Sequence, residues 1–290
     1  MKTVDTLVSD IYTMLETKEI PEGVSLEEEC ERFGRDMGEL LLAQLQPEED
    51  RRGLRLSQVG RPERQIYNDY HRLGGQSHGG PTYIKFLYGH IVEAMVLALT
   101  RISGHEVTDE QKVCHVAGVK GHMDCRIDGI LTDVKSCSSF GFKKFRNNKL
   151  HEDDPFGYIG QLKAYAHSEG DRTYGWLALD KQNGTLAWLQ YHEDDNEGAP
   201  YKEAIDWDVE DKVKRLKKLV GSDLLPTVCY EPIPEGKSGN MQLASGCRWC
   251  DYKFKCWPNL RVYNYANGPK YLSTVVKEPR VAGVEIPDEF

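Results

Sequence analysis

The sequence predicts an α/β fold in which a mixed sheet is flanked by helices. Two hairpin signals, Asp128-Gly129 and Asn183-Gly184, each join apolar segments, and such dipeptides suit the positive φ angles of tight turns. Helical spacing of apolar residues over 83–102 and a helix start at Asp154-Pro155 place helices around these strands. The order helix, three strands, helix, strand is typical of a sheet that buries its faces against helices.

The segments before the first predicted strand are expected to be helical. In residues 1–46, Ser25 and the glutamates after it form a capping-box pattern. Apolar residues then recur at helical spacing, at Leu26, Phe33, Met37, Leu40, Leu41 and Leu45. Residues 54–70 begin as a turn and enter a helix, and a glycine-rich connector follows.

The remaining elements follow the turn signals along the chain. A strand is predicted over 106–115, leading into the hairpin at Asp128-Gly129. The helix that starts at Asp154 is expected to run to about residue 168, where Gly170 stops it. A final helix is predicted over 201–219. The predicted pairs of the first hairpin are Ile127–Ile130, Arg126–Leu131, Cys125–Thr132 and Asp124–Asp133.

This register places two carboxylates and an ammonium on one small surface. Asp124 faces Asp133, and Lys135 lies two residues further on the same face of its strand. Like charges at opposed positions repel each other, and a cation between them reverses that penalty. Carboxylates, with the carbonyl oxygen of Val134, suit Mg²⁺ or Mn²⁺. The alternative is a solvated hairpin in which Asp133 and Lys135 form an ordinary surface ion pair.

Composition bounds the class of protein. With a net charge of -9 the chain does not coat nucleic acid by charge alone, but basic residues cluster after the hairpin, Lys143 and Lys144 among them. The sequence shows no apolar segment of the roughly 20 residues that cross a bilayer, and its first residues lack the pattern of a signal peptide. A cytosolic protein that does not enter membranes is therefore expected.

Three of the eight cysteines form a compact array. Cys247, Cys250 and Cys256 are spaced C-x-x-C-x5-C, which in a cytosolic protein indicates a metal site or cluster before a disulfide. Three thiolates need a fourth ligand for a zinc or [4Fe–4S] site. Cys30 is the first candidate and Cys229 the second, and free structural cysteines are the alternative.

Four motifs in sequence order resemble the PD-(D/E)XK nuclease superfamily, specifically its RecB-like branch. They are Gly89-His90-Ile91-Val92-Glu93, Gly121-His122-Met123-Asp124, Asp133-Val134-Lys135 and Gln161-Leu162-Lys163-Ala164-Tyr165. The resemblance covers residues 83–180 and the cysteine region. It implies a restriction-endonuclease-like core, αβββαβ, over 83–225, with a helical region at 1–82 and a cysteine-rich module at 226–290.

The resemblance also implies roles for single residues. Glu93, Asp124 and Asp133 are expected to hold one or two Mg²⁺ or Mn²⁺ ions, assisted by Val134 and His90, while Lys135 positions the attacking water. The residues expected to contact DNA are Gln161, Tyr165, Lys143, Lys144 and Arg64. The implied activity is phosphodiester hydrolysis, as an exonuclease at DNA ends, in recombination, repair or degradation. The alternatives are a non-catalytic nucleic-acid-binding or assembly protein on the same fold and a zinc-stabilised adaptor.

The cysteine array resembles that of AddB-type and CRISPR-associated RecB-like nucleases. There it joins one upstream cysteine in holding a [4Fe–4S] cluster. Here Pro62 stands where the CRISPR-associated group has that cysteine. The layout is also similar to that of RecB-like nucleases predicted from bacteriophage genomes, which implies the cytoplasm of a bacterial host.

Overall fold

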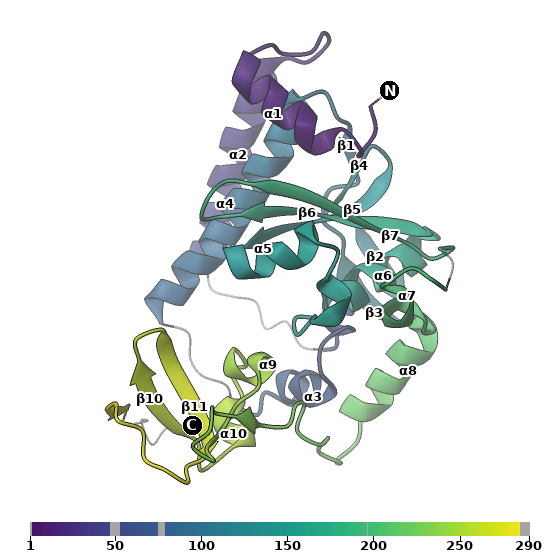
Figure 1. Cartoon of the computed structure of the whole chain (residues 1–290). Helices are drawn as coiled ribbons and strands as arrows, with labels where there is room; N and C mark the ends of the chain where they lie inside the picture. Colours follow the sequence, from purple (N-terminus) through teal and green to yellow (C-terminus); the bar gives the residue numbers. More distant parts are fainter. Residues whose placement is uncertain (1, 47–52, 75–78, 196, 285–290) are drawn as a thin grey trace. The chain divides into compact units, whose positions relative to one another are not determined.

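Two compact units make up the chain in a computed structural model that describes residues 2–46, 53–74, 79–195 and 197–284 (Figure 1). Unit 1 comprises Met1–Gly60, His78–Asp154 and Tyr158–Val213. Unit 2 comprises Arg61–Ser77, Pro155–Gly157 and Lys214–Phe290. The carboxylates of the hairpin therefore belong to unit 1, and the C-terminal cysteines belong to unit 2.

The centre of unit 1 is a mixed sheet with strand order β1-β4-β5-β6-β7. Only β5 and β6 are parallel, and the other neighbouring strands are antiparallel. The strands are β1 (Val107–Thr108), β4 (Cys125–Ile127), β5 (Ile130–Cys137), β6 (Thr173–Asp180) and β7 (Leu186–His192). The predicted mixed sheet is confirmed, and so is the hairpin at Asn183-Gly184, which joins β6 to β7.

Helices cover both faces of this sheet (Figure 1). On one face, α1 (Leu7–Thr17) and α4 (Gly80–Ile102) pack against alternate strand residues such as Val134 and Leu177. On the other face lie α5 (Ser139–Arg146) and α6 (Tyr158–Glu169). Because side chains alternate along a strand, the residues next to Val134 on β5, Asp133 and Lys135, point to the α6 face.

Helix α4 is long and apolar enough, by length and composition, to cross a membrane, although the sequence analysis expects no such segment. Its C-terminal half is part of the unit 1 core. Val96 and Leu97 are buried there together with Leu177 of β6 and Ile127 of β4. The apolar residues in the C-terminal half of α4 therefore have a packing role in the sheet layer, whereas Ile84 and Phe86 near its start are exposed.

The N-terminal region contains two helices, not one continuous helical segment. After α1 the chain turns through Pro21 and Gly23 before α2 (Leu26–Leu45). The predicted cap is confirmed, because the Glu28 N–H donates to Ser25 Oγ at 3.3 Å. Helix α2 packs against α4 and has no fully buried residue, so its predicted apolar face is only partly covered.

Two predicted elements are interrupted by turns. The strand predicted over 106–115 is wrong, because Asp109 and Gln111 adopt φ angles of 53° and 54° and split it into β1 and β2 (Val113–Val116). Strand β2 pairs with β3 (Val119–His122) in a separate two-stranded sheet. The helix predicted over 201–219 is α7 (Lys202–Ile205) and α8 (Val209–Val220). Asp208 starts α8 by accepting from the Asp211 N–H at 2.7 Å.

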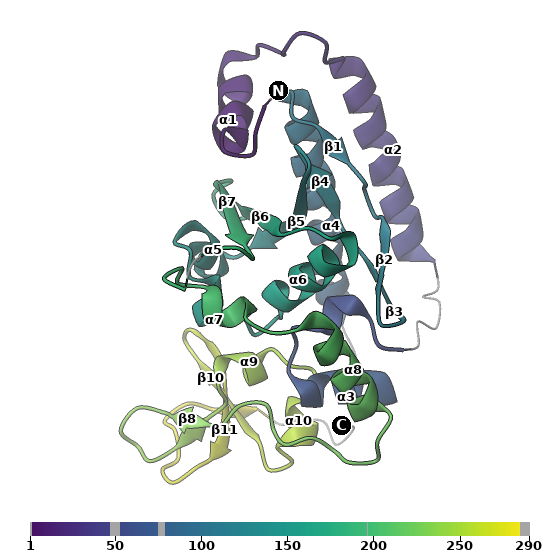
Figure 2. The same cartoon turned by 90° about the vertical axis from the view of Figure 1, so that its right-hand side faces the viewer.

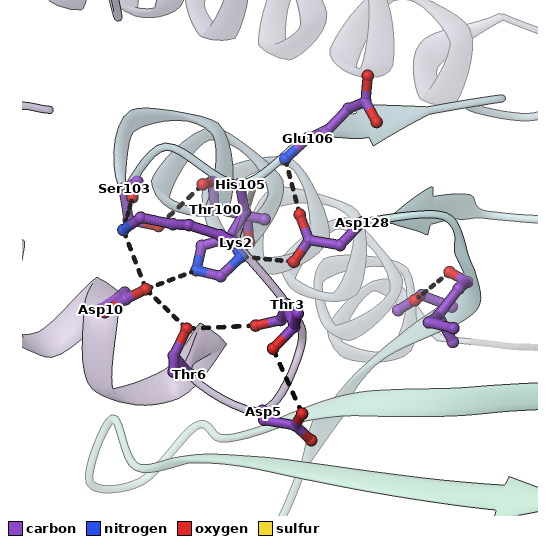
Figure 3. Close-up of polar contacts among 12 residues, drawn as sticks. Lys2, Thr3, Asp5, Thr6, Asp10, Thr100, Ser103, His105, Glu106 and Asp128 are labelled. Carbon is purple, nitrogen blue, oxygen red and sulfur yellow. Dashed lines mark hydrogen bonds and ion pairs between the residues drawn. The ribbon is translucent and has the colours of Figure 1, made fainter. Parts of the chain in front are cut away.

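A polar network fastens the hairpin turn to the N-terminal residues (Figure 3). His105 is fully buried between two carboxylates, with Nδ1 2.7 Å from Asp128 Oδ2 and Nε2 3.1 Å from Asp10 Oδ2. Lys2 donates to the carbonyl of Ser103 at 2.7 Å and pairs with Asp10 at 2.9 Å. This network holds the turn between β4 and β5 against the end of α4 and the start of α1.

Unit 2 is built from short elements. Its sheet has the order β12-β10-β11-β9-β8, and its small core centres on Leu243, Cys247 and Leu260. Its strands are β8 (Ile233–Pro234), β9 (Met241–Gln242), β10 (Arg261–Tyr265), β11 (Gly268–Thr274) and β12 (Gly283–Val284). Its helices, some of which Figure 2 shows from a second side, include α3 (Glu63–His71), α9 (Ser245–Arg248) and α10 (Lys253–Cys256).

Candidate functional site

The hairpin forms as the sequence predicts up to its last pair. Asp128 and Gly129 have φ angles of 49° and 81°, and the ladder contains the predicted pairs from Ile127–Ile130 to Cys125–Thr132. Asp124 lies one residue outside β4, so the fourth predicted pair is not part of the ladder. Instead, the Val134 N–H donates to Asp124 Oδ2 at 3.0 Å, which holds this carboxylate beside β5.

Asp133 and Lys135 form the centre of the site. The Asp133 side chain is 1% exposed, and Lys135 Nζ lies 2.8 Å from its Oδ1 and 2.6 Å from its Oδ2. Gln161 Nε2 of α6 donates to Oδ1 at 3.3 Å. Oδ2 is buried and receives no well-aligned hydrogen bond, although the ammonium lies close to it. A buried carboxylate oxygen with free lone pairs suits a cation as an additional partner.

Burial and neighbouring negative charges raise the pKa of two acids of the site, Glu93 and Asp133. Burial, followed by the negative charges of Asp124 and Asp133, raises the pKa of Glu93 to about 8. Burial also raises the pKa of Asp133 to about 8, with Lys135 acting in the opposite direction and Asp124 in the same direction. Burial disfavours the charged form of Lys135, but Asp133 and Asp124 outweigh it and raise the pKa of this ammonium. A divalent ion would offset this repulsion.

Glu93 joins the site from α4, whereas His90 does not. Glu93 is partly buried, and Gln111 Nε2 lies 3.5 Å from its Oε1. His90, three residues earlier, is exposed to solvent, and the charges that act on Glu93 come from Asp124, Asp133, Lys135 and Glu110. The structure therefore brings three of the predicted carboxylates into one electrostatic group without His90.

The two motif residues of α6 have different positions. Gln161 contacts Asp133, but Tyr165 is 2% exposed and packs beneath the segment that leads to Asp124. A Cβ atom on Gly121 would lie 2.6 Å from the Tyr165 ring and 2.8 Å from Leu56 Cβ. The Tyr165 ring is therefore buried against Gly121, while burial, followed by the nearby charges of Asp133 and Asp124, raises the pKa of its phenol. Its predicted contact with DNA stays a prediction.

Two further residues adjoin the site that the sequence analysis did not single out. The Tyr158 ring lies under the Lys135 ammonium, with Nζ 4.8 Å from the ring centroid, and burial raises the pKa of this phenol to about 12. Tyr158 is three residues before Gln161, so helical spacing alone would have placed it on the same face. Gln111, which contacts Glu93, lies in the turn that the sequence analysis took for a strand.

The basic residues predicted to contact DNA differ in exposure and in the partners that they already have. Lys143 is exposed on α5, whereas Lys144 donates to the carbonyl and carboxylate of Asp153 at 2.7 and 2.6 Å. Arg64 belongs to unit 2, where its Nη1 donates to the Pro226 carbonyl at 2.7 Å. Of these three, Lys143 is the exposed cation, whose charge also acts on Asp180, and Arg64 fastens a loop within its own unit.

The C-terminal cysteines share one pocket in unit 2. Its lining includes the predicted Cys247, Cys250 and Cys256 and also Cys229, the second candidate for a fourth ligand. Cys30, the first candidate, is exposed on α2 in unit 1. All eight cysteines are free thiols, without disulfides.

Neither the carboxylates of unit 1 nor the thiols of unit 2 are arranged with metal-coordination geometry among the described residues. Among the residues that the structure describes, no three or more His, Cys, Asp or Glu side chains form a group that holds a metal ion. The donor types nevertheless match metals of different kinds. The oxygen atoms of Glu93, Asp124, Asp133 and Val134 suit a hard cation, and the thiols of unit 2 suit a soft metal.

The chain matches no protein-family model and no curated protein. Solved structures that are similar to it include the alkaline exonuclease LHK-Exo from Laribacter hongkongensis, with 15% identity, a TM-score of 0.38, and coverage of 66% of this chain and 94% of that one. LHK-Exo in complex with dAMP gives 14% identity and a TM-score of 0.34, covering 55% and 80%. The protein SSO0001 gives 14% identity and a TM-score of 0.40, covering 77% and 95%. At these values the likeness establishes neither a shared fold nor a shared activity.

Proposed function

We propose that this chain is a divalent-metal-dependent deoxyribonuclease that hydrolyses phosphodiester bonds, acting as an exonuclease at DNA ends. One observation supports it above the others. A buried carboxylate, Asp133, is ion-paired with Lys135 on the same strand, and Asp124 and Glu93 add two acids to the same electrostatic group. A purely structural ion pair does not require two additional acids beside it, and burial together with the charges of Asp124 and Asp133 raises the pKa of one of them, Glu93.

The chain's own residues would divide the work as follows. Asp133, Asp124 and Glu93, with the Val134 carbonyl, would hold Mg²⁺ or Mn²⁺, which when bound polarises a phosphoryl oxygen and acidifies a water. Lys135 is held by Asp133 and by the Tyr158 ring, and its ammonium would orient the attacking water and offset developing negative charge. Gln161 fixes the Asp133 carboxylate by donating to Oδ1.

The DNA strand would meet unit 1 at α5, which begins two residues after β5 ends. Lys143 on this helix is exposed, and Phe140, 72% exposed, lies one turn before it. An exposed aromatic ring beside an exposed cation can stack on a base and pair with a phosphate. A local contact of this kind is compatible with a protein whose net charge is -9.

The test is DNA cleavage by the full chain with and without added metal. End-labelled single-stranded and duplex DNA are incubated with the wild type, Asp133→Asn and Lys135→Ala, in Mg²⁺, Mn²⁺ or EDTA. Lys149→Ala is the matched control, because this lysine is exposed and forms an ion pair with the nearby Glu152. We expect metal-dependent release of nucleotides by the wild type and the control, and a loss of about 10³-fold or more in both site variants.

The outcomes separate the alternatives. Equal degradation by all four proteins would assign the activity to a contaminant and contradict the proposal. DNA binding without cleavage by any of them would favour a binding or assembly protein on this fold. Products that shorten from the ends, as opposed to internal fragments, distinguish exonuclease from endonuclease action.

A further inference from the structure

The unit 2 pocket gathers four thiols from two short segments. Cys229 comes from the loop after α8, and Cys247, Cys250 and Cys256 come from α9, α10 and the turn between them. All four thiols line the same pocket, together with Val228 and Tyr230 on either side of Cys229. Cys229 is therefore part of this group and not a separate loop cysteine.

Backbone N–H groups point at three of these sulfur atoms. The N–H groups of Arg64 and Gln65, in the first turn of α3, donate to the Cys229 sulfur. Those of Tyr230 and Tyr252 donate to Cys247 and Cys250. The start of a helix leaves N–H groups without intrahelical partners, and the N-cap Pro62 has no side-chain cap bond. Such donors stabilise sulfur as thiolate and are the usual partners of metal-bound cysteine.

Two other groups at the pocket suit negatively charged sulfur. The Trp257 indole N–H is buried at the pocket and is directed at the Cys247 sulfur. Lys253 is 5% exposed, lines the same pocket, and donates to the Cys250 carbonyl at 3.2 Å. A buried ammonium is costly by itself and is stabilised by negative charge nearby. Four thiolates around a dication would supply a net negative charge at this position.

We propose that Cys229, Cys247, Cys250 and Cys256 are the four ligands of one thiolate-bound metal centre contained within unit 2, with Cys229 and not Cys30 as the fourth ligand. The centre is either an iron–sulfur cluster or a zinc ion, since both take four thiolates. It does not depend on the proposed nuclease activity of unit 1. Pro62 lines the same pocket, so Cys229 takes the place that an upstream cysteine at position 62 would hold.

The first experiment uses the wild-type chain. It is purified anaerobically, and iron, acid-labile sulfide and zinc are measured together with the visible spectrum. Iron with sulfide and visible absorption indicates a cluster, and zinc without them indicates a mononuclear site. Each cysteine is then alkylated before and after metal removal and located by mass spectrometry. We expect metal to protect Cys229 together with the other three thiols, while Cys30 reacts equally in both states.

The second experiment compares variants of the full chain. Cys229→Ser is expected to lose at least about tenfold in metal occupancy, because one of four ligands is gone. Cys30→Ser is the matched control and is expected to keep full occupancy. The double variant Pro62→Cys with Cys229→Ser is expected to recover part of the metal, because the new thiol enters the same pocket.

Three results would overturn the proposal. One is a wild-type chain that contains no thiol-bound metal after anaerobic reconstitution with iron and sulfide or with zinc. Another is metal loss in Cys30→Ser with retention in Cys229→Ser. The third is alkylation of Cys229 that does not change on metal removal, a measurement on the wild type that holds even if Cys229→Ser does not fold.

Discussion

The two candidate sites differ in what holds them in place. In unit 1, Asp133 and Glu93 are contacted by the side chains of Lys135, Gln161 and Gln111, whereas Asp124 is held by a backbone N–H, that of Val134. In unit 2, thiols from short helices and a loop are met by backbone N–H groups. The first site sits on a packed five-stranded sheet, and the second adjoins a core of a few residues.

This difference predicts a different relation between metal and folding. A site built on a packed sheet folds without its metal, so metal removal there costs activity. Unit 2 has short elements and a small core around Leu243, Cys247 and Leu260, so we expect the proposed metal centre to add to its folding stability. The predictions that follow test this contrast in order of decreasing effect.

The largest expected effect is that a variant in one site abolishes the function of that site and leaves the other site intact. Asp124→Asn removes a carboxylate that is held against the Val134 N–H, and cleavage should fall about 10³-fold while the thiol-bound metal stays. Cys250→Ser should release that metal and make unit 2 sensitive to limited proteolysis, while Mn²⁺ binding to unit 1 persists. Nuclease rates, metal analysis and proteolysis on the same preparations provide the check. If either variant disturbed both sites equally, the contrast would be wrong.

The next effect concerns packing under the hairpin. Gly121→Ala places a methyl group 2.6 Å from the Tyr165 ring and 2.8 Å from Leu56, so these side chains must shift. We expect a loss of about 2–3 kcal/mol in the stability of unit 1, as for overpacked cores. Gly34→Ala is the matched control, because nothing lies within 4 Å of its Cβ position in α2, and alanine there is expected to be neutral or stabilising. Urea denaturation measures both.

Sequence alone could predict the hairpin because its turn and register are local. The dipeptide Asp128-Gly129 determines a type I′ turn, and the three ladder pairs follow from it. The fourth pair fails for a reason that no local pattern contains, since Asp124 bonds to the backbone of Val134 and leaves the ladder. The strand before the hairpin was mispredicted because Asp109 and Gln111 take left-handed backbone angles.

Features that depend on contacts between distant segments of the chain could not be predicted from the sequence. The motif that contains Gln161 and Tyr165 gives no sign that one side chain reaches Asp133 while the other is buried under Gly121. The choice between Cys30 and Cys229 is of the same kind, since spacing offers both and only the fold places Cys229 beside the other thiols.

A further prediction uses the raised pKa values of Glu93 and Asp133, both about 8. Below that pH the folded, metal-free site keeps protons that the unfolded chain would release, so metal must displace them. Mn²⁺ affinity should therefore rise by up to about tenfold per pH unit and per displaced proton between pH 6 and 8, and level off above. Calorimetry on the DNA-free protein measures this.

The control for that measurement is a variant that lacks one of the two titrating carboxyl groups. Glu93→Gln removes one titrating group, so the slope of affinity against pH should fall by one proton. The metal-free protein should also lose stability as pH rises from about 4 to about 8, because the folded state binds more protons than the unfolded state throughout that range. A Mn²⁺ affinity that is flat across these pH values would contradict the charge repulsion inferred for the site.

The smallest expected effect is on DNA binding at α5. Lys143→Ala should weaken binding to all sequences and reduce the slope of log affinity against log salt by about one, since one phosphate contact is lost. Phe140→Ala should weaken binding by about fivefold or more without changing the salt slope, because a stacked ring carries no charge. Lys144→Ala is the matched control, since its ammonium is already bound to Asp153. Fluorescence anisotropy with single-stranded DNA in EDTA separates binding from cleavage. If Lys144→Ala changed the salt slope as much as Lys143→Ala, the exposed cation of α5 would have no special role, and the path of the strand would have to be sought elsewhere on unit 1.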